Sequence, residues 1–176
     1  MVLLESQSLE LGSQLHHFRL PNACGDDFCS EQITKDIVLI GFICNHCPYV
    51  VKIINEFSAL AKKYKNDVDF VTISANDPDY REEDSFENMT SFAHKHGFTF
   101  PYLFDEDQEV AKRYKAVCTP DLFVFKKDDQ QRYRLAYHGR FEDLEKALVD
   151  LTYAKEVKFE QLPSIGCSIK WKEDSK

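Results

Sequence analysis

The stretch from Ile37 to Tyr64 constrains the fold of this chain more than any other segment. Residues 37–43 are apolar without interruption apart from Gly41, a pattern typical of a strand buried on both faces, as in a parallel sheet. After Pro48, apolar side chains recur at three- and four-residue spacing through residue 64, which predicts a helix with one face on a core. Pro48 suits the first turn of that helix, because its missing N–H would have no partner there. A buried strand therefore leads directly into a helix.

Two cysteines lie at this junction, in the motif Cys44-Asn45-His46-Cys47. The first turn of a helix exposes unpaired N–H groups and a partial positive charge, and both stabilise a thiolate. The thiolate is the form that attacks a disulfide, and a second thiol three residues away can resolve the mixed disulfide that results. His46, when protonated, adds positive charge at the same place. The motif therefore predicts reversible dithiol–disulfide exchange, with Cys44 as the more exposed and more acidic nucleophile and Cys47 as the resolving thiol.

The length and the charge of the chain exclude several classes of protein. No linker or repeat divides the 176 residues, so we expect a single domain over 1–176 with its own hydrophobic core. The 30 acidic and 22 basic residues give a net charge of −8, which argues against nucleic acid or an anionic membrane as a partner. No apolar run has the length of a membrane span, and residues 1–5 lack the basic start of a signal peptide. We therefore expect a cytoplasmic protein, in which six cysteines are catalytic, metal-binding or incidental thiols rather than a disulfide framework.

The rest of the pattern predicts an α/β chain. A hairpin of short strands precedes the motif, and strands and helices alternate after it. The expected strands cover residues 17–20, 28–33, 68–74, 98–104, 122–125 and 132–138, and the expected further helices cover 86–96, 105–114 and 141–154. Residues 155–176 form a polar tail, in which Trp171 and two isoleucines predict docking on the domain.

Together these residues resemble the thioredoxin-fold superfamily, most closely its peroxiredoxin-like branch, the alkyl hydroperoxide reductase/thiol-specific antioxidant (AhpC/TSA) proteins. The likeness rests on the Cys-Asn-His-Cys-Pro motif, on Thr119-Pro120 just before an apolar strand, on the leading hairpin and on the inserted region 76–104. The tail over 163–171 is also similar to the close of a small thioredoxin-like family with this motif. The resemblance implies a central mixed β-sheet flanked by helices, with an N-terminal β-hairpin and an inserted helix and strand region.

The resemblance also implies roles for residues outside the motif. Thr119-Pro120 looks like the cis-proline of the superfamily, so we expect a cis bond there and a Thr119 backbone left open to pair with an extended substrate strand. Protein or small-molecule thiols and disulfides would be the substrates, with an electron donor of thioredoxin or glutathione type and no cofactor. Cys118 and Cys167 are candidate accessory thiols.

The motif departs from a peroxiredoxin in the residues that activate peroxide. The family's Pro-x-x-x-Thr/Ser-x-x-Cys, counted back from Cys47, falls on Ile40 and Cys44. The region where its arginine would fall holds Cys118-Thr119-Pro120 instead. A histidine before the second cysteine is similar to the motif of disulfide isomerases, whose potentials are more oxidising.

Three hypotheses remain open at this point. The first is a thiol–disulfide oxidoreductase, and the second is a thiol peroxidase with Cys47 as the peroxidatic cysteine. The third is a metal-binding module, but no second Cys-x-x-Cys or His-x-x-x-His pair exists to complete a zinc site, so we expect no metal. Its ligands would be Cys44, His46 and Cys47, joined by Cys118 or Cys167.

Overall fold

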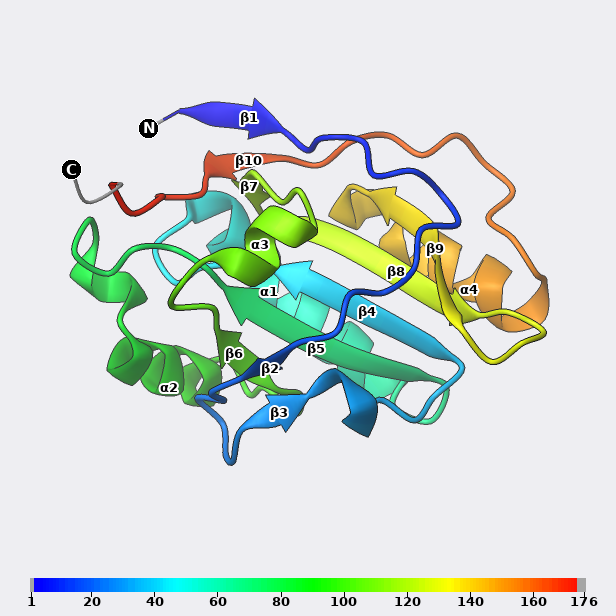
Figure 1. The fold of residues 1–176 in the computed structure, drawn as a ribbon, viewed down its shortest axis with the longest axis horizontal. Helices are drawn as coiled ribbons and strands as arrows, with labels where there is room; N and C mark the ends of the chain where they lie inside the picture. Colours follow the sequence, from blue (N-terminus) through cyan, green and yellow to red (C-terminus); the bar gives the residue numbers. More distant parts are fainter. Residues whose placement is uncertain (1, 174–176) are drawn as a thin grey trace.

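The computed structural model describes residues 2–173. At its centre lies a mixed five-stranded sheet (Figure 1). The strand order is β6-β5-β4-β8-β9. β4 pairs in parallel with β5 and antiparallel with β8, which confirms the predicted central mixed sheet. The strands are β4 (Ile37–Phe42), β5 (Val68–Ser74), β6 (Tyr102–Phe104), β8 (Asp121–Lys127) and β9 (Tyr133–Gly139).

The predicted buried strand is the central strand β4, and every one of its residues is buried. Its side chains alternate between two core clusters, one on each face of the sheet. Leu39 packs in the cluster that contains Ile54 and Leu148, whereas Ile40 packs in the cluster that contains Tyr114. Both faces of the sheet are therefore covered, which explains the continuous apolar run in the sequence.

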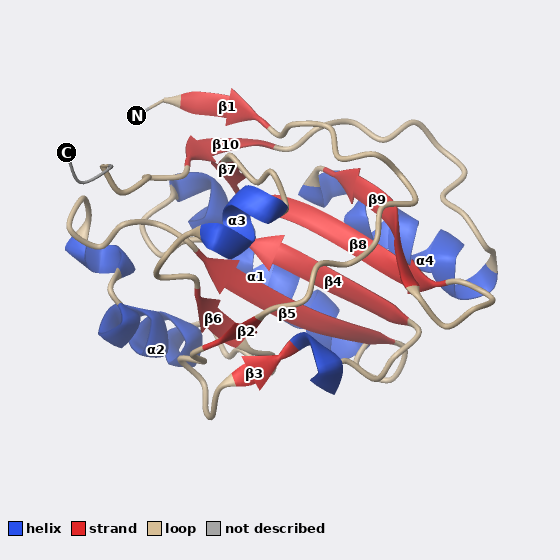
Figure 2. Cartoon of the chain, viewed as in Figure 1, coloured by secondary structure: helices blue, strands red, loops and turns tan. Residues whose placement is uncertain are grey.

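Helices supply these covers (Figure 2). α1 (Pro48–Lys63) and α4 (Leu144–Tyr153) lie behind the sheet in this view, and the short α3 (Glu109–Arg113) lies in front of it. α2 (Phe86–Lys95) follows a short 3-10 turn in the inserted region and begins at Ser85, whose side chain accepts a hydrogen bond from the N–H of Asn88. Its Met89 and Ala93 are buried, whereas Phe86 is 40% exposed and its ring packs on that of Phe104. Within residues 2–173, no helix combines the length and the apolar character that crossing a bilayer requires.

The leading hairpin is present but shorter than expected. β2 (Arg19–Leu20) pairs antiparallel with β3 (Phe28–Cys29), and Ser30–Gln32 turn into a 3-10 helix instead of continuing the strand. β6 is an edge strand of the main sheet, as predicted, and it begins directly after Pro101.

A second, three-stranded sheet lies beside the motif and was not predicted. It joins β1 (Leu3–Glu5), β10 (Ile165–Ser168) and β7 (Cys118–Thr119) in the order β1-β10-β7, with both pairings antiparallel. Segments from the two ends of the described chain therefore lie side by side (Figure 1). The tail docks through this backbone pairing, and of its apolar residues Ile169 is buried, whereas Trp171 is 39% exposed and Ile165 is 51% exposed.

Candidate functional site

The two motif cysteines lie between the end of β4 and the start of α1, as predicted. Cys47 is the N-cap residue of α1, and Pro48 is the first residue of the helix. Both Cys44 and Cys47 have an exposed fraction of 0%. The expectation that Cys44 is the more exposed thiol is therefore wrong, because segments distant in the sequence pack over both sulfur atoms.

Thr119 and Cys167 are the distant residues that contact these sulfur atoms. The Sγ of Cys44 lies 3.3 Å from the Oγ1 of Thr119, and the Sγ of Cys47 lies 3.3 Å from the carbonyl oxygen of the same residue. The Thr119–Pro120 bond is cis, which confirms that prediction. The Sγ of Cys167 lies only 2.8 Å from the Sγ of Cys47. The structure thus brings a third thiol to the predicted pair.

The surroundings shift the pKa values of the two motif thiols in opposite directions. A hydrogen bond from Cys44 is the main cause that lowers the pKa of the Cys47 thiol far below its usual range, and Cys167 and the backbone N–H of Val50 add to it. These donors outweigh burial and the nearby Thr119 carbonyl, both of which oppose a thiolate. The same hydrogen bond, followed by burial and the charge of Asp84, raises the pKa of Cys44 well above its usual range.

These opposite directions favour a reduced pair with the thiolate at Cys47 and the thiol at Cys44. The sequence-based expectation that Cys44 is the more acidic thiol is wrong. Two neighbours that the motif does not contain, Cys167 and Asp84, contribute to this reversal.

His46 is held by Asp84, a fully buried residue at the end of the 3-10 turn Glu82–Asp84. Oδ1 of Asp84 accepts hydrogen bonds from the backbone N–H groups of Asn45 (2.8 Å) and His46 (3.2 Å). Oδ2 contacts the ring Nδ1 of His46 and accepts a hydrogen bond from Nδ2 of Asn76 at 2.8 Å. Burial alone would raise the pKa of Asp84, but the hydrogen bonds from His46 and Asn76 outweigh it and lower the pKa. Asp84 thus fixes both the backbone and the ring of the motif.

Asp84 and Asn76 were missed as site residues. No local pattern marks either residue, because their partners lie in other segments. Asn76 also accepts a hydrogen bond from the backbone N–H of Lys170 at 3.0 Å, which ties the tail to the same network.

The backbone of Thr119 is not open to a substrate strand in the described chain. Cys167 of β10 stands opposite Thr119 in the antiparallel register. Gly166 allows this close approach: a Cβ atom at that position would lie 2.0 Å from the carbonyl oxygen of Thr119. The expected substrate edge is therefore occupied by the chain's own strand.

Cys118 lies on β7 beside this site, but its environment opposes chemistry. Burial is the main cause that raises its pKa far above the usual range, and the charge of Asp121 adds to it. Its Sγ contacts the carbonyl oxygen of Pro120 at 4.0 Å. Burial likewise raises the pKa of Cys167, to about 12, so the feature that distinguishes Cys167 is its 2.8 Å Sγ contact with Cys47.

One group of site residues has ligand atoms close enough to hold a metal ion. The ligand atoms of Cys44, His46 and Asp84 lie within 4.8 Å of one another. This set differs from the expected one, since Asp84 replaces Cys47. Both oxygens of Asp84 already receive hydrogen bonds from N–H donors, which a metal ion would have to displace. The hydrogen-bonded arrangement satisfies these groups without an ion.

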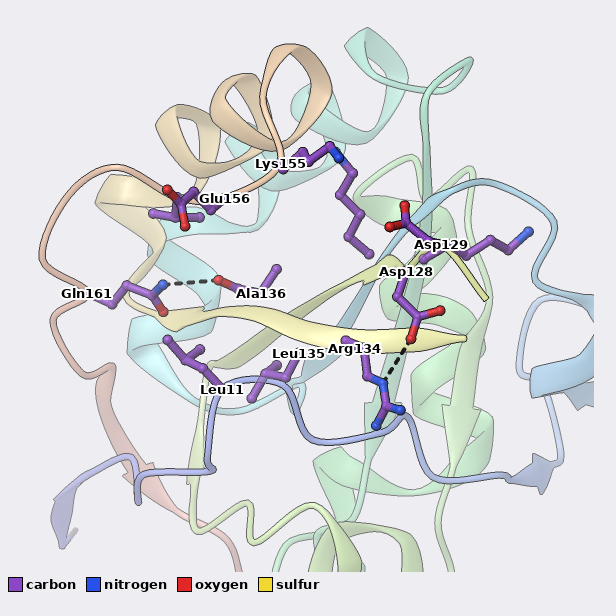
Figure 3. Close-up of a pocket in the computed structure, with 12 residues that line it drawn as sticks. Leu11, Asp128, Asp129, Arg134, Leu135, Ala136, Lys155, Glu156 and Gln161 are labelled. Atoms are coloured by element: carbon purple, nitrogen blue, oxygen red, sulfur yellow. Dashed lines mark hydrogen bonds and ion pairs between the residues drawn. The ribbon is translucent and has the colours of Figure 1, made fainter. Parts of the chain in front are cut away.

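A cavity of about 580 Å³ lies beside the cis-proline loop. Tyr49 at the start of α1 and Pro120 after the cis bond form part of its wall, with Lys52 and Arg140 also lining it. A second cavity, of about 540 Å³, lies at the far end of the β8–β9 hairpin and is lined by Leu11, Asp128 and Arg134 among others (Figure 3). None of the cysteines lines either cavity, but the cavity beside Pro120 is lined by two residues next to the site, Tyr49 and Pro120.

Comparisons with known proteins place the chain in a family. Residues 11–134 match the AhpC/TSA family. An uncharacterized conserved protein from Geobacillus kaustophilus is 39% identical over 99% of both chains, with a TM-score of 0.93. A hypothetical protein from Sinorhizobium meliloti is 36% identical over 97% of this chain and 99% of that one, with a TM-score of 0.90.

More distant structures share the thioredoxin-like fold. A thiol-disulfide oxidoreductase from Bacteroides fragilis is 19% identical, with a TM-score of 0.64 over 79% of this chain and 99% of its own. Among curated protein sequences, none matches the chain. The family match covers most of the chain and the described site lies within a thioredoxin-like fold, so this chain belongs to the AhpC/TSA family.

Proposed function

We propose that the chain is a thiol–disulfide oxidoreductase in which Cys44 and Cys47 alternate between a dithiol and a disulfide. The observation that carries the proposal is the hydrogen-bonded pair of thiols at the start of α1, whose pKa values are shifted in opposite directions. A dithiol that shares one proton has a nucleophile and a resolving thiol in contact, which is the arrangement that exchange requires.

The charge distribution assigns the two roles. The thiolate of Cys47 attacks one sulfur of a substrate disulfide and forms a mixed disulfide, while the other substrate sulfur leaves as a thiolate. The Cys44 thiol gives its proton to that leaving thiolate and attacks the Sγ of Cys47, which releases the first substrate sulfur. The substrate has then gained two electrons, and the protein holds the Cys44–Cys47 disulfide. A donor of thioredoxin or glutathione type returns both thiols to the reduced form.

His46 is a positioning residue in this scheme. Its side chain is only 12% exposed, and Asp84 holds its Nδ1 and its backbone N–H. His46 thus links the buried carboxylate to the motif cysteines.

The substrates would be small or protein disulfides that enter the cavity beside Pro120. The wall of this cavity carries both signs of charge, from Lys52 and Arg140 and from Glu5 and Glu142, and Tyr49 lies two residues after Cys47. Pro120 takes part as a wall of the cavity, while the backbone of Thr119 is occupied by β10. The cytoplasmic location expected from the sequence belongs to this proposal, because a reducing compartment keeps the six cysteines as thiols.

A second candidate function is a thiol peroxidase that uses Cys47, and the low pKa of this buried thiol favours it. A peroxidatic cysteine also needs donors that stabilise negative charge on the departing hydroxide. The threonine and arginine that supply them in peroxiredoxins are replaced here, and losing one well-placed donor typically costs on the order of 10²-fold in rate. Disulfide exchange is therefore the better-supported reaction.

The test is to expose the reduced protein to oxidised glutathione and, separately, to hydrogen peroxide, and to map the products by peptide mass spectrometry. We expect glutathione to produce a Cys44–Cys47 disulfide rapidly and peroxide to do so slowly. Cys44→Ser and Cys47→Ser should each abolish this disulfide, whereas Cys24→Ser, which removes an exposed thiol, should not. Fast peroxide oxidation of Cys47 with no glutathione reaction would support the peroxidase, and no disulfide at Cys47 with either oxidant would overturn both readings.

A further inference from the structure

Three sulfur atoms, rather than two, lie in a row in this site, and each contacts the next. Cys47 is the middle member: it is hydrogen-bonded to Cys44 on one side and lies 2.8 Å from the Sγ of Cys167 on the other. All three residues are buried. A disulfide that includes Cys47 therefore has two neighbouring thiols as possible partners, and one of them, Cys167, lies 120 positions after Cys47.

We propose that Cys167 is a third redox-active thiol of the site and forms an alternative disulfide with Cys47. The disulfide would move between Cys44–Cys47 and Cys47–Cys167, which makes Cys167 a catalytic residue of the strand β10. This inference rests on the proposed function, because it requires a disulfide at Cys47 to begin with.

The position of Cys167 is held by the backbone on both sides of it. On the N-terminal side, the Oγ of Ser164 donates a hydrogen bond to the carbonyl oxygen of Gly139 at 2.9 Å. On the C-terminal side, the backbone N–H of Ile169 donates to the carbonyl oxygen of Val117 at 2.9 Å. Cys167 is thus presented to Cys47 by a strand anchored at both ends rather than by a mobile tail.

Because Gly166 has no side chain, its backbone can lie directly against the loop that contains the cis-proline. The nearest atoms to a Cβ at Gly166 would be the carbonyl oxygen of Thr119 at 2.0 Å and its carbonyl carbon at 2.6 Å. A residue with any side chain would hold β10, and with it Cys167, farther from Cys47. The strand is therefore built for the close approach that thiol exchange needs.

The exchange step balances without an external oxidant. The Cys167 thiol loses its proton and its sulfur attacks the Sγ of Cys47 in the Cys44–Cys47 disulfide. The bond between Cys47 and Cys167 forms as the bond between Cys44 and Cys47 breaks, and Cys44 leaves as a thiolate that takes up the proton. The protein remains oxidised by two electrons throughout, but Cys44 is a thiol again.

The two disulfides differ in what they cross-link. The Cys44–Cys47 disulfide closes a small ring within one loop, whereas the Cys47–Cys167 disulfide joins the start of α1 to β10. In the second form the strand that covers the backbone of Thr119 is covalently fixed in place. The position of the disulfide therefore determines whether β10 can leave the site.

Disulfide mapping in the unmodified protein tests the proposal directly. The reduced protein is oxidised with one equivalent of oxidised glutathione, quenched in acid, alkylated with N-ethylmaleimide and mapped by mass spectrometry. We expect both cross-links, with Cys44 and Cys167 each alkylated in part and in complementary amounts. A population in which Cys167 is always alkylated and Cys44 never is would overturn the proposal, while leaving the proposed function intact.

Variants supply a second, kinetic readout. In Cys44→Ser we expect the glutathione adduct on Cys47 to be resolved by Cys167, yielding the Cys47–Cys167 disulfide. In the double variant Cys44→Ser/Cys167→Ser, the adduct should last on the order of 10-fold longer or more, because an intramolecular attack is lost. Cys44→Ser/Cys24→Ser is the matched control and should behave as Cys44→Ser does. Equal lifetimes in the two double variants would refute a role for Cys167, and the absence of any adduct or disulfide at Cys47 would instead refute the proposed function.

Discussion

Asp84 contacts His46 through both the ring Nδ1 and the backbone N–H of the histidine, from a position 38 residues farther along the chain. The carboxylate also accepts hydrogen bonds from Asn45 and Asn76. The inserted region 76–104 therefore holds the loop of the Cys-x-x-Cys motif in place.

Replacing this carboxylate should destabilise the fold. Asp84→Ala leaves the N–H donors of Asn45, His46 and Asn76 without their acceptor in a buried place, so we expect a loss of about 3 kcal/mol in the free energy of unfolding. Urea unfolding measures it. Glu83→Ala is the control, since only the backbone carbonyl of this exposed residue takes part in a hydrogen bond, and it should change the stability by less than about 0.5 kcal/mol. Equal effects of the two substitutions would contradict the assigned role of Asp84.

The same residue should make the stability depend on acid pH. The pKa of Asp84 is lower in the folded protein than the ordinary carboxyl value of 3.8. The unfolded chain therefore binds the proton first, so the stabilisation is fully present above this value and is lost as the pH falls through the folded pKa. Unfolding curves of the wild type and of Asp84→Asn should converge as the pH is lowered in that range. A difference that stays constant with pH would show that the charge of Asp84 has no part in it.

Titration of the thiols tests the distribution of charge in the reduced pair. Ultraviolet thiolate absorbance should show one thiolate that persists well below the usual thiol range and is lost in Cys47→Ser. Cys44→Ala should raise the pKa of Cys47, because it removes the largest of the stabilising hydrogen bonds, and Cys167→Ala should raise it as well. Cys24→Ala should leave the titration unchanged. An acidic thiolate that survives in Cys47→Ser would restore Cys44 as the nucleophile.

A methyl group at Gly166 should separate β10 from the site. Gly166→Ala places a Cβ 2.0 Å from the carbonyl oxygen of Thr119, so β10 must move, at a cost of about 1–3 kcal/mol in stability. Alkylation of Cys167 in the reduced protein should become faster at the same time. Gly25→Ala is a fair control, because its Cβ would meet no atom closer than 3.8 Å. Unchanged alkylation of Cys167 in Gly166→Ala, with the fold intact, would show that the strand is not held by this contact.

The local sequence patterns predicted the features that depend on residues close together in the chain. The buried strand β4, the helix α1 and the position of Cys44 and Cys47 between them follow from apolar periodicity and from Pro48 within one stretch of the chain. The mixed sheet and the cis bond before Pro120 followed from the resemblance that these residues carry.

The features that decide the chemistry depend on pairs far apart in the sequence. The contact of Cys47 with Cys167 spans 120 positions, and no periodicity in either segment indicates it. The pKa order of the two motif thiols depends first on the hydrogen bond between them, but Asp84 and Cys167 also contribute to it from other segments. Short strands such as β1 and β10 have too few residues to show a period, so the second sheet could not be predicted.

Because β10 pairs with Thr119, the chain itself occupies the backbone edge that an extended substrate would need. A peptide that binds the same backbone edge would have to displace a strand that belongs to the same chain and stays close to the site. Its apparent affinity would equal its intrinsic affinity multiplied by the fraction of time for which β10 is released. Extended polypeptides should therefore bind weakly there, while compact disulfides that use only the cavity beside Pro120 escape the competition. The free energy needed to release β10 from Thr119 would then set the selectivity between the two kinds of substrate.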